Sequence, residues 1–183
     1  MSITKDRQNT AYLALSEAYG YTSPMQSPRI EKVIVSTGVG KKRDPKQTAL
    51  IEDRVAKITG QKAALRKARL SIASFKLREG DTVGLQVTLR GARMYDFLDK
   101  LIHIALPRTR DFRGLSAAAI DDMGNMTIGI REHTIFPETG DEDVKDVFGI
   151  AVTIVTSAKS KAEAEAFFRH IGLPLRVDEG VKR

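Results

Sequence analysis

Glycines and cations near position 40 are the residues of this chain best suited to chemistry. Gly38-Val39-Gly40 precedes the basic run Lys41-Lys42-Arg43. A phosphate-binding P-loop would need glycine at position 35 and Ser or Thr at 42, and a dinucleotide-binding turn would need glycine at 43. Val, Lys and Arg stand there. Two interpretations stay open: a strand-ending turn whose glycines tolerate positive φ, or a bare backbone that RNA approaches while the cations neutralise phosphates.

A second basic segment covers residues 62–78 and contains no acid. Such a run is usually a solvated loop, but Phe75 lies among the cations and could stack on a base or a ribose. This composition favours RNA over an acidic metabolite. The six cations are Lys62, Arg66, Lys67, Arg69, Lys76 and Arg78.

Catalytic and metal-binding groups lack the spacing of an active site. The three histidines are scattered, and His103 is expected to be packed in an apolar helix. The chain has no Cys, which excludes thiol chemistry and thiolate metal sites. The acidic stretch 138–146 lacks calcium-loop spacing and fits a solvated loop or a dock for a basic protein better. We therefore expect no enzyme, no metal and no cofactor.

Charge is unevenly divided along the 183 residues. The formal net charge is +7, but residues 1–113 carry 22 Lys and Arg against 11 Asp and Glu, whereas residues 114–183 carry 8 against 12. This division indicates two different partners, one of them a polyanion. No apolar run approaches the roughly 20 residues that span a bilayer, and the N-terminus leads into no signal-type segment. We expect a cytoplasmic protein without a membrane partner.

Periodicity predicts the elements that must position these groups. Helices are expected at 4–19, between Pro45 and Gly60, between Gly91 and Pro107, and from a capping box at Ser160 and Glu163 to Gly172. Apolar alternation predicts strands at 29–37, 63–68, 83–90, 126–131 and 147–156. Residues 69–82 show no clean period and are expected to be a long loop, and the tail from 175 to 183 is expected to be frayed.

The predicted fold is therefore a single α+β domain over 1–183. A largely antiparallel sheet would carry helices packed on one face. The polar face and the long basic loop would be exposed, and the polar face would present Gln86, Thr88, Arg90, Thr127 and Arg131.

Several segments, in order, resemble one family over about residues 10–174. That family is the bacterial form of large-subunit ribosomal protein five, the 5S rRNA binder of the central protuberance. The matching segments are Met25–Lys32, Gly38–Gly40, Ile58–Lys62, Ser71–Gly80, Val87–Gly91, Ala105–Arg108, Asp111–Gly114, Gly124–Asn125, Ile135–Glu138 and Thr153–Thr156.

The resemblance implies three contact regions and a place among 23S rRNA and other central-protuberance proteins. The 5S rRNA site would be Ser36, Thr37, Gly38, Val39, Gly40, Lys41, Gln61, Lys62, Thr88 and Arg90. A loop touching P-site tRNA would use Ser71, Ile72, Ser74, Phe75, Lys76 and Arg78. An intersubunit bridge to small-subunit protein thirteen would use Arg110, Asp111, Phe112, Arg113, Glu142 and Asp143.

Two departures from the family pattern lie inside these regions. Ser36 stands where the family usually has Asn, and Ser74 replaces a usual Gly. Two other functions remain as alternatives: a regulatory RNA-binding module outside the ribosome, which co-sedimentation with large subunits would test, and an RNA-modifying or phosphate-ester enzyme, which stabilisation by nucleotides or S-adenosylmethionine would test.

Overall fold

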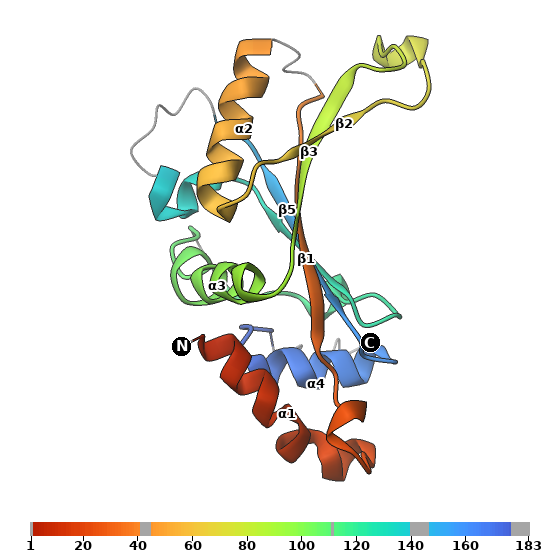
Figure 1. Cartoon of the computed structure of the whole chain (residues 1–183), viewed down its shortest axis with the longest axis vertical. Helices are drawn as coiled ribbons and strands as arrows, with labels where there is room; N and C mark the ends of the chain where they lie inside the picture. Colours follow the sequence, from red (N-terminus) through yellow and green to blue (C-terminus); the bar gives the residue numbers. More distant parts are fainter. Residues whose placement is uncertain (1, 41–44, 111, 140–146, 177–183) are drawn as a thin grey trace, which may run out of the picture. The chain divides into compact units, whose positions relative to one another are not determined.

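The computed structural model describes residues 2–40, 45–110, 112–139 and 147–176 (Figure 1). Helices and strands occur in this part of the chain where periodicity predicts them, within a few residues at each end. They are α1 Ile3–Tyr19, β1 Ile30–Gly38, α2 Pro45–Thr59, β2 Ala64–Lys67, β3 Thr82–Leu89, α3 Ala92–Lys100, β4 Met126–Ile130, β5 Ile150–Thr156 and α4 Lys161–Ile171. A π-helical turn, Leu101–Ala105, continues α3.

The described strands form one antiparallel sheet in the order β2-β3-β1-β5-β4, which confirms the α+β class. Burial alternates along β4 and β5, whereas β2 is exposed throughout. In β4, Met126, Ile128 and Ile130 are buried, and Thr127 and Gly129 are exposed. One face of β4 and β5 is therefore covered and the other accessible, as the alternating sequence predicts.

The chain divides into two compact units. The terminal unit contains the described residues of 1–33, 90–128 and 153–183, and the central unit those of 34–89 and 129–152. The strands β1, β4 and β5 each pass from one unit into the other. The single domain expected from chain length stays a prediction.

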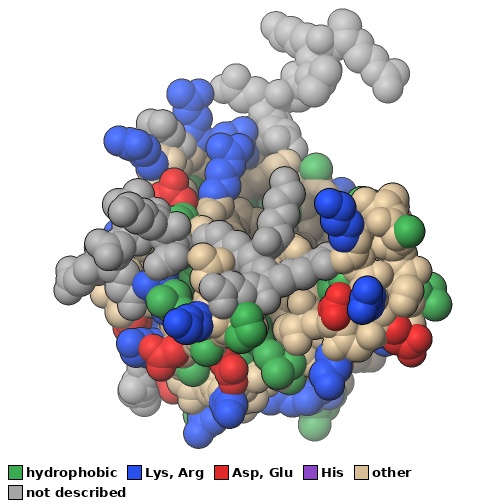
Figure 2. All heavy atoms as spheres, turned by 90° about the horizontal axis from the view of Figure 1, so that it is seen from above, with side chains coloured by type: hydrophobic (Ala, Val, Ile, Leu, Met, Phe, Trp, Pro, Cys, Tyr) green, Lys and Arg blue, Asp and Glu red, His purple; other side chains and the backbone are tan. Residues whose placement is uncertain are grey.

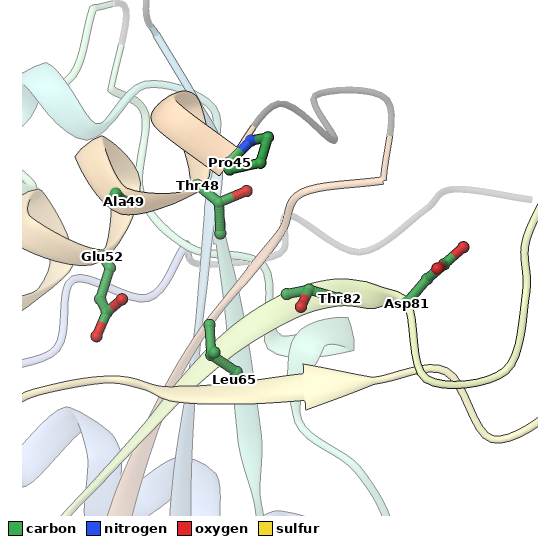
Figure 3. Close-up of a pocket in the computed structure, with 7 residues that line it drawn as sticks. All are labelled: Pro45, Thr48, Ala49, Glu52, Leu65, Asp81 and Thr82. Carbon is green, nitrogen blue, oxygen red and sulfur yellow. The ribbon is translucent and has the colours of Figure 1, made fainter.

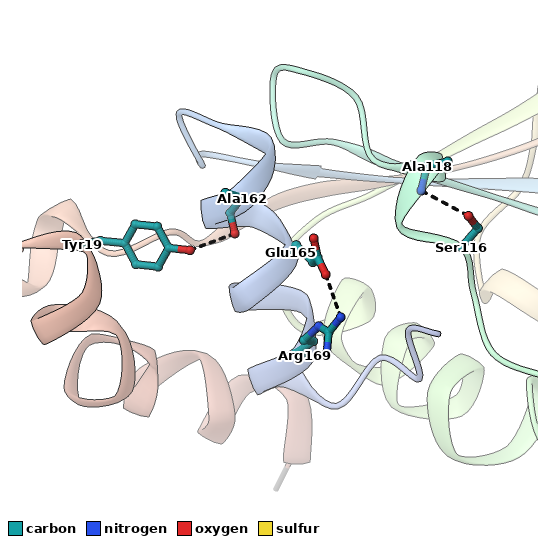
Figure 4. A network of polar contacts seen from close by, with 6 residues as sticks. All are labelled: Tyr19, Ser116, Ala118, Ala162, Glu165 and Arg169. Carbon is teal, nitrogen blue, oxygen red and sulfur yellow. Dashed lines mark hydrogen bonds and ion pairs between the residues drawn. The ribbon is translucent and has the colours of Figure 1, made fainter. Parts of the chain in front are cut away.

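In the terminal unit, α1 packs against α3 and α4. Ser160 caps α4 by accepting from the Glu163 amide at 3.3 Å, as the capping pattern predicts. The Glu163 carboxylate accepts from the Lys159 amide at 2.7 Å and from the Tyr21 hydroxyl. Figure 4 shows the Tyr19 hydroxyl donating to the Ala162 carbonyl at 2.9 Å. Tyr19 at the end of α1 and Tyr21 just after it thus hold the first turn of α4.

In the central unit, α2 covers β3. Ile51, Val55 and Ile58 of α2 are buried, as predicted, and so are Leu85 and Val87 of β3. These side chains give the central unit an apolar core of its own, and this core fixes the ends of β1 and β3 from which the candidate RNA-binding residues extend.

Two local expectations are wrong. Leu175 and Arg176 are held rather than frayed, because the Leu115 amide donates to Pro174 O at 2.7 Å and the Arg176 amide donates to Leu115 O at 2.8 Å. His103 is exposed rather than packed, and it lies in the π-helical turn Leu101–Ala105. The fully buried histidine is His133, whose ring stacks on Phe148 with centroids 4.1 Å apart.

Candidate RNA interface

The turn that ends β1 is fixed from inside the central unit. The Thr37 hydroxyl donates to the Gly149 carbonyl at 2.7 Å, and the Val39 amide donates to the Val83 carbonyl at 2.9 Å. Both side chains are buried. Thr37 and Val39, which the resemblance places in the 5S rRNA site, therefore hold the turn in shape, while Gly38 and Gly40 face outward.

Gly38 has neither of the usual structural reasons to be glycine. Its φ is not positive, and an added Cβ would meet nothing within 4 Å. Gly38 ends β1, as the interpretation of a strand-ending turn predicts, but neither Gly38 nor Gly40 uses the positive φ that glycine tolerates. A side chain would fit here as far as the protein itself is concerned. The bare backbone is thus left open to whatever approaches from outside.

Gly84 is a positioning residue that sequence reasoning missed. A Cβ at this position would lie 2.8 Å from the Thr37 carbonyl oxygen. Glycine therefore lets β3 approach β1 closely at the turn. An isolated glycine inside an alternating strand is a recognised sign of close backbone approach, and this sign could have identified it.

The remaining candidates are only partly gathered. Gln61 follows α2, and its amide Nε2 lies 3.5 Å from the Thr88 carbonyl oxygen of β3. Lys62 is exposed, with its Nζ 3.6 Å from the Glu52 carboxylate. Arg90 is exposed and belongs to the terminal unit, and Lys41 lies outside the described residues. The structure therefore brings Gln61 and Thr88 together.

The accessible side of β2 and β3 is polar, as predicted. Ala64 pairs with Gln86 and Arg66 with Gly84 across the two antiparallel strands. The Arg66 guanidinium donates to the Gln86 amide oxygen at 2.6 Å, with both side chains on that side. A surface with ordered cations and amides suits contacts to phosphate and ribose.

The basic segment 69–80 is a hairpin extension of β2 and β3, not an irregular loop. Ile72 and Leu77 exchange backbone hydrogen bonds at 2.9 and 3.1 Å, and a 3-10 turn at Ala73–Phe75 closes the tip. Below the tip, Gly80 N donates to Ala68 O at 3.0 Å. Figure 1 shows the segment projecting from the ends of β2 and β3. Backbone pairing therefore fixes the tip.

The side chains of this hairpin tip are presented outward. Phe75 is 71% exposed, and Lys76 adopts φ of 49°, unusual for a residue other than glycine. The structure therefore places all six tRNA-loop candidates at the surface: Ser71, Ile72, Ser74, Phe75, Lys76 and Arg78.

The bridge candidates are described only in part. Arg110 and Arg113 are exposed and Phe112 is half-buried, all in the terminal unit. The Arg113 carbonyl accepts from Arg176 Nε at 3.1 Å, so the C-terminal segment holds this loop. The candidates that lie outside the described residues are Asp111, Glu142 and Asp143.

Lys and Arg side chains stand out on the face seen in Figure 2. A hollow of about 380 Å³ lies between α2 and the β2–β3 pair, and two carboxylates line it (Figure 3). Glu52 is near Lys62, and Asp81 accepts from the Arg78 amide at 2.9 Å. Both acids are thus engaged separately rather than forming a catalytic pair.

Two further searches cover the described residues. None of their helices is long and apolar enough to cross a membrane. No group of three or more His, Asp or Glu side chains in these ranges is placed to hold a metal ion.

Comparison with known proteins gives a consistent result. The family described as Ribosomal protein L5 matches residues 23–78, and the model of the C-terminus of the same ribosomal family matches residues 82–175. The "Large ribosomal subunit protein uL5" of Anaeromyxobacter sp. (strain K) is 47% identical over 163 residues, 88% of this chain and 91% of that protein. The protein of the same name from Trichlorobacter lovleyi is 48% identical over 173 residues, covering 92% and 95%.

Proposed function

This chain belongs to the L5 family of ribosomal proteins, and from that premise we propose that it attaches 5S rRNA through the turn after β1. Membership makes it a structural, non-enzymatic constituent of the large ribosomal subunit, located in the cytoplasmic ribosome. The proposal is that the protein binds 5S rRNA and contacts P-site tRNA and the small subunit.

The bare backbone at Gly38 carries the 5S rRNA assignment. Nothing inside the protein requires glycine there, so the open space supports close approach of an RNA backbone. Ser36 precedes it in β1, and Gln61 and Thr88 together supply amide and hydroxyl groups for phosphate and ribose contacts. Lys62 and Arg90 neutralise phosphates, and each phosphate neutralised makes binding more sensitive to salt.

The hairpin 69–80 is the tRNA contact in this proposal. Its tip is preformed by the Ile72–Leu77 backbone pair, so little chain entropy is lost on binding. Phe75 is exposed and can cover a ribose or a base, while Lys76 and Arg78 meet phosphates.

The loop Arg110–Arg113 is the intersubunit contact, together with the acidic stretch 138–146. Acidic side chains attract a basic protein such as small-subunit protein thirteen. 23S rRNA and the other proteins of the central protuberance complete the set of partners.

A pair of glycine substitutions tests the 5S rRNA assignment. Gly38→Ala and Gly129→Ala each add a Cβ that meets nothing within 4 Å inside the protein. Gly129 lies on β4 outside the proposed site, so it is the matched control. We expect both variants to keep the melting temperature, and Gly38→Ala alone to weaken 5S rRNA binding about tenfold, or about 1.4 kcal/mol.

Binding is measured as a salt titration against 5S rRNA and a control RNA of similar length. The log of the association constant should fall with log salt by roughly 0.7–0.9 per phosphate contacted. Equal affinity of the unaltered protein for both RNAs, or equal loss in both glycine variants, would contradict the proposal and revive the regulatory-module alternative.

A further inference from the structure

A small cleft in the terminal unit uses a segment that the three proposed contact regions leave out. It has a volume of about 220 Å³ and lies between α1 and the connector Ser23–Arg29. The connector contains Met25-Gln26-Ser27-Pro28, part of the first family-like segment. This volume is below the roughly 300–1,000 Å³ of pockets for drug-sized ligands, so it suits a single ring system.

Of the polar side chains that line this cleft, Gln8 is used by the protein, because its amide donates to the Tyr95 hydroxyl at 2.9 Å and accepts from the Ile30 amide at 3.0 Å. The other polar side chains of the lining are not used by any residue that the structure describes. The Ser27 hydroxyl oxygen is buried and has no hydrogen-bond partner among the described residues. In the same part of the chain, no hydrogen bond or ion pair engages the side chains of Asn9, Tyr12 or Arg29. A buried hydroxyl without a partner is uncommon in folded proteins, which supports an external partner for it.

The other walls of the cleft are apolar. Pro24, Met25 and Pro28 line it, and the lining contains no carboxylate. A cationic side chain from a partner protein would therefore find no counter-charge. A planar group with apolar faces and a hydrogen-bonding edge, attached to an anion, fits the lining better.

We propose that this cleft receives one unpaired nucleobase of ribosomal RNA. The base lies between the prolines and the methionine, and the Asn9 amide and the Tyr12 hydroxyl read its edge. The Ser27 hydroxyl, which is buried in the free protein, rotates toward the cleft to join them. Arg29 at the exposed rim neutralises the phosphate of the same nucleotide. Sequence-specific RNA recognition commonly uses such splayed-out bases, held by stacking and by contacts to their hydrogen-bonding edges.

This inference rests on the ribosomal assignment but concerns a different place from the 5S rRNA turn. The cleft belongs to the terminal unit, whereas Ser36–Gly40, Gln61 and Thr88 belong to the central unit. The two proposals therefore fail separately. Equal binding of 5S and control RNA would remove the 5S site without affecting the cleft.

Site-directed cross-linking tests the proposal in assembled large subunits. Gln26 follows Met25, is exposed and does not line the cleft, so a photoreactive benzophenone amino acid can replace it without removing a wall of the cleft. After irradiation, reverse transcription should stop at one nucleotide that is unpaired in the ribosomal RNA. A cross-link confined to a neighbouring protein, or no cross-link at all, would overturn the proposal.

Ser27→Ala separates binding from folding. Removing a buried unpaired hydroxyl should leave the melting temperature unchanged or raise it. In subunits assembled from the photoreactive protein, Ser27→Ala and Asn9→Ala should each lower the cross-link yield about tenfold, or about 1.4 kcal/mol if the yield follows occupancy. Leu13→Ala, on the same helix but not lining the cleft, should leave the yield unchanged.

A free nucleotide has the same base and phosphate as a nucleotide of ribosomal RNA, so it is the remaining alternative ligand of the cleft. Titration of the isolated protein with each nucleoside monophosphate, followed by nuclear magnetic resonance of the Asn9 side-chain amide, should show no saturable shift at millimolar concentration. Saturation there would mean a site for a soluble nucleotide and would overturn the assignment to ribosomal RNA. Unchanged cross-link yields in both Ser27→Ala and Asn9→Ala would also overturn the proposal.

Discussion

The guanidinium of Arg7 lies in the space where residue 172 would carry a side chain. A Cβ at Gly172 would be 1.8 Å from Arg7 Nη1, and the same Nη1 donates to the Ile171 carbonyl at 2.8 Å. Gly172 has φ of 99° and ends α4. The Gly172 amide caps α4 by donating to the Phe168 and Arg169 carbonyls, and an arginine of α1 adds a further donor for which glycine makes room.

Gly172→Ala should destabilise the protein by about 2–3 kcal/mol, because it adds a left-handed backbone penalty to the displacement of Arg7. Chemical denaturation measures the difference. Gly20→Ala is the control, since Gly20 also has positive φ but an added Cβ there would meet nothing within 4 Å. Equal losses in the two variants would show that Arg7 contributes nothing at this site.

Asp99→Ala should free the start of α1. The Asp99 carboxylate accepts from the Thr4 amide at 2.8 Å and from the Thr4 hydroxyl at 2.5 Å. Loss of a helix N-terminal acceptor costs about 1 kcal/mol, measured by urea unfolding at neutral pH. Asp96, like Asp99, belongs to α3, and its carboxylate is exposed. Asp96→Ala should therefore lower the free energy of unfolding by less.

The same contact predicts a dependence on pH. Burial raises the pKa of Asp99, but hydrogen bonds from Ser2 and Thr4 outweigh it, and the net pKa lies below the ordinary value. A carboxyl group whose pKa is lower in the folded than in the unfolded protein stabilises the fold at pH values above its unfolded pKa of about 3.9. This stabilisation is lost as the pH falls below that value. The stability difference between the unaltered protein and Asp99→Ala should therefore shrink below about pH 4. A constant difference would contradict this account.

Tyr21→Phe should cost about 1–3 kcal/mol, because it leaves the buried Glu163 carboxylate short of a donor. Burial first, and then Glu163, raise the pKa of Tyr21, so its hydroxyl remains a donor at neutral pH. Thermal unfolding gives the measurement. Tyr19→Phe removes a more exposed hydrogen bond, to the Ala162 carbonyl, and should cost less (Figure 4).

Replacing Lys76 with Gly and Arg78 with Ala should leave folding and 5S rRNA affinity nearly intact while weakening a tRNA-linked step of translation. Gly is chosen at position 76 because the backbone there has φ of 49°. Peptidyl-tRNA retention and 5S rRNA affinity are measured on the same protein. Unchanged tRNA retention would argue against the hairpin as the contact.

Patterns that depend on local chemistry could be predicted from the sequence. The Ser160 and Gly172 signals bound α4, and apolar alternation located β3 and β4, because a cap or a buried face requires only residues nearby. Pairing within 69–80 could not be predicted, because the Ile72–Leu77 bonds depend on a non-glycine residue with positive φ between them.

The candidate site likewise combines features that the sequence shows with features that only the structure shows. Glycine at 38 was visible in the sequence, but its backbone angle and empty surroundings were not. The proximity of Gly84 to Thr37 depends on how β3 pairs with β1, which lies far from it along the chain. The distant partners Arg7, Tyr21 and Asp99 were missed for the same reason.

The division into units sets an order of events during synthesis. By Leu89 the nascent chain contains β1, α2, β2 and β3, yet the central unit also needs residues 129–152. At about 5–20 residues per second those segments follow several seconds later. Helix α1, made first, must wait longer still for α4. Neither unit can therefore be completed before most of the chain has been translated, so its apolar strands lack part of their packing partners until late in synthesis.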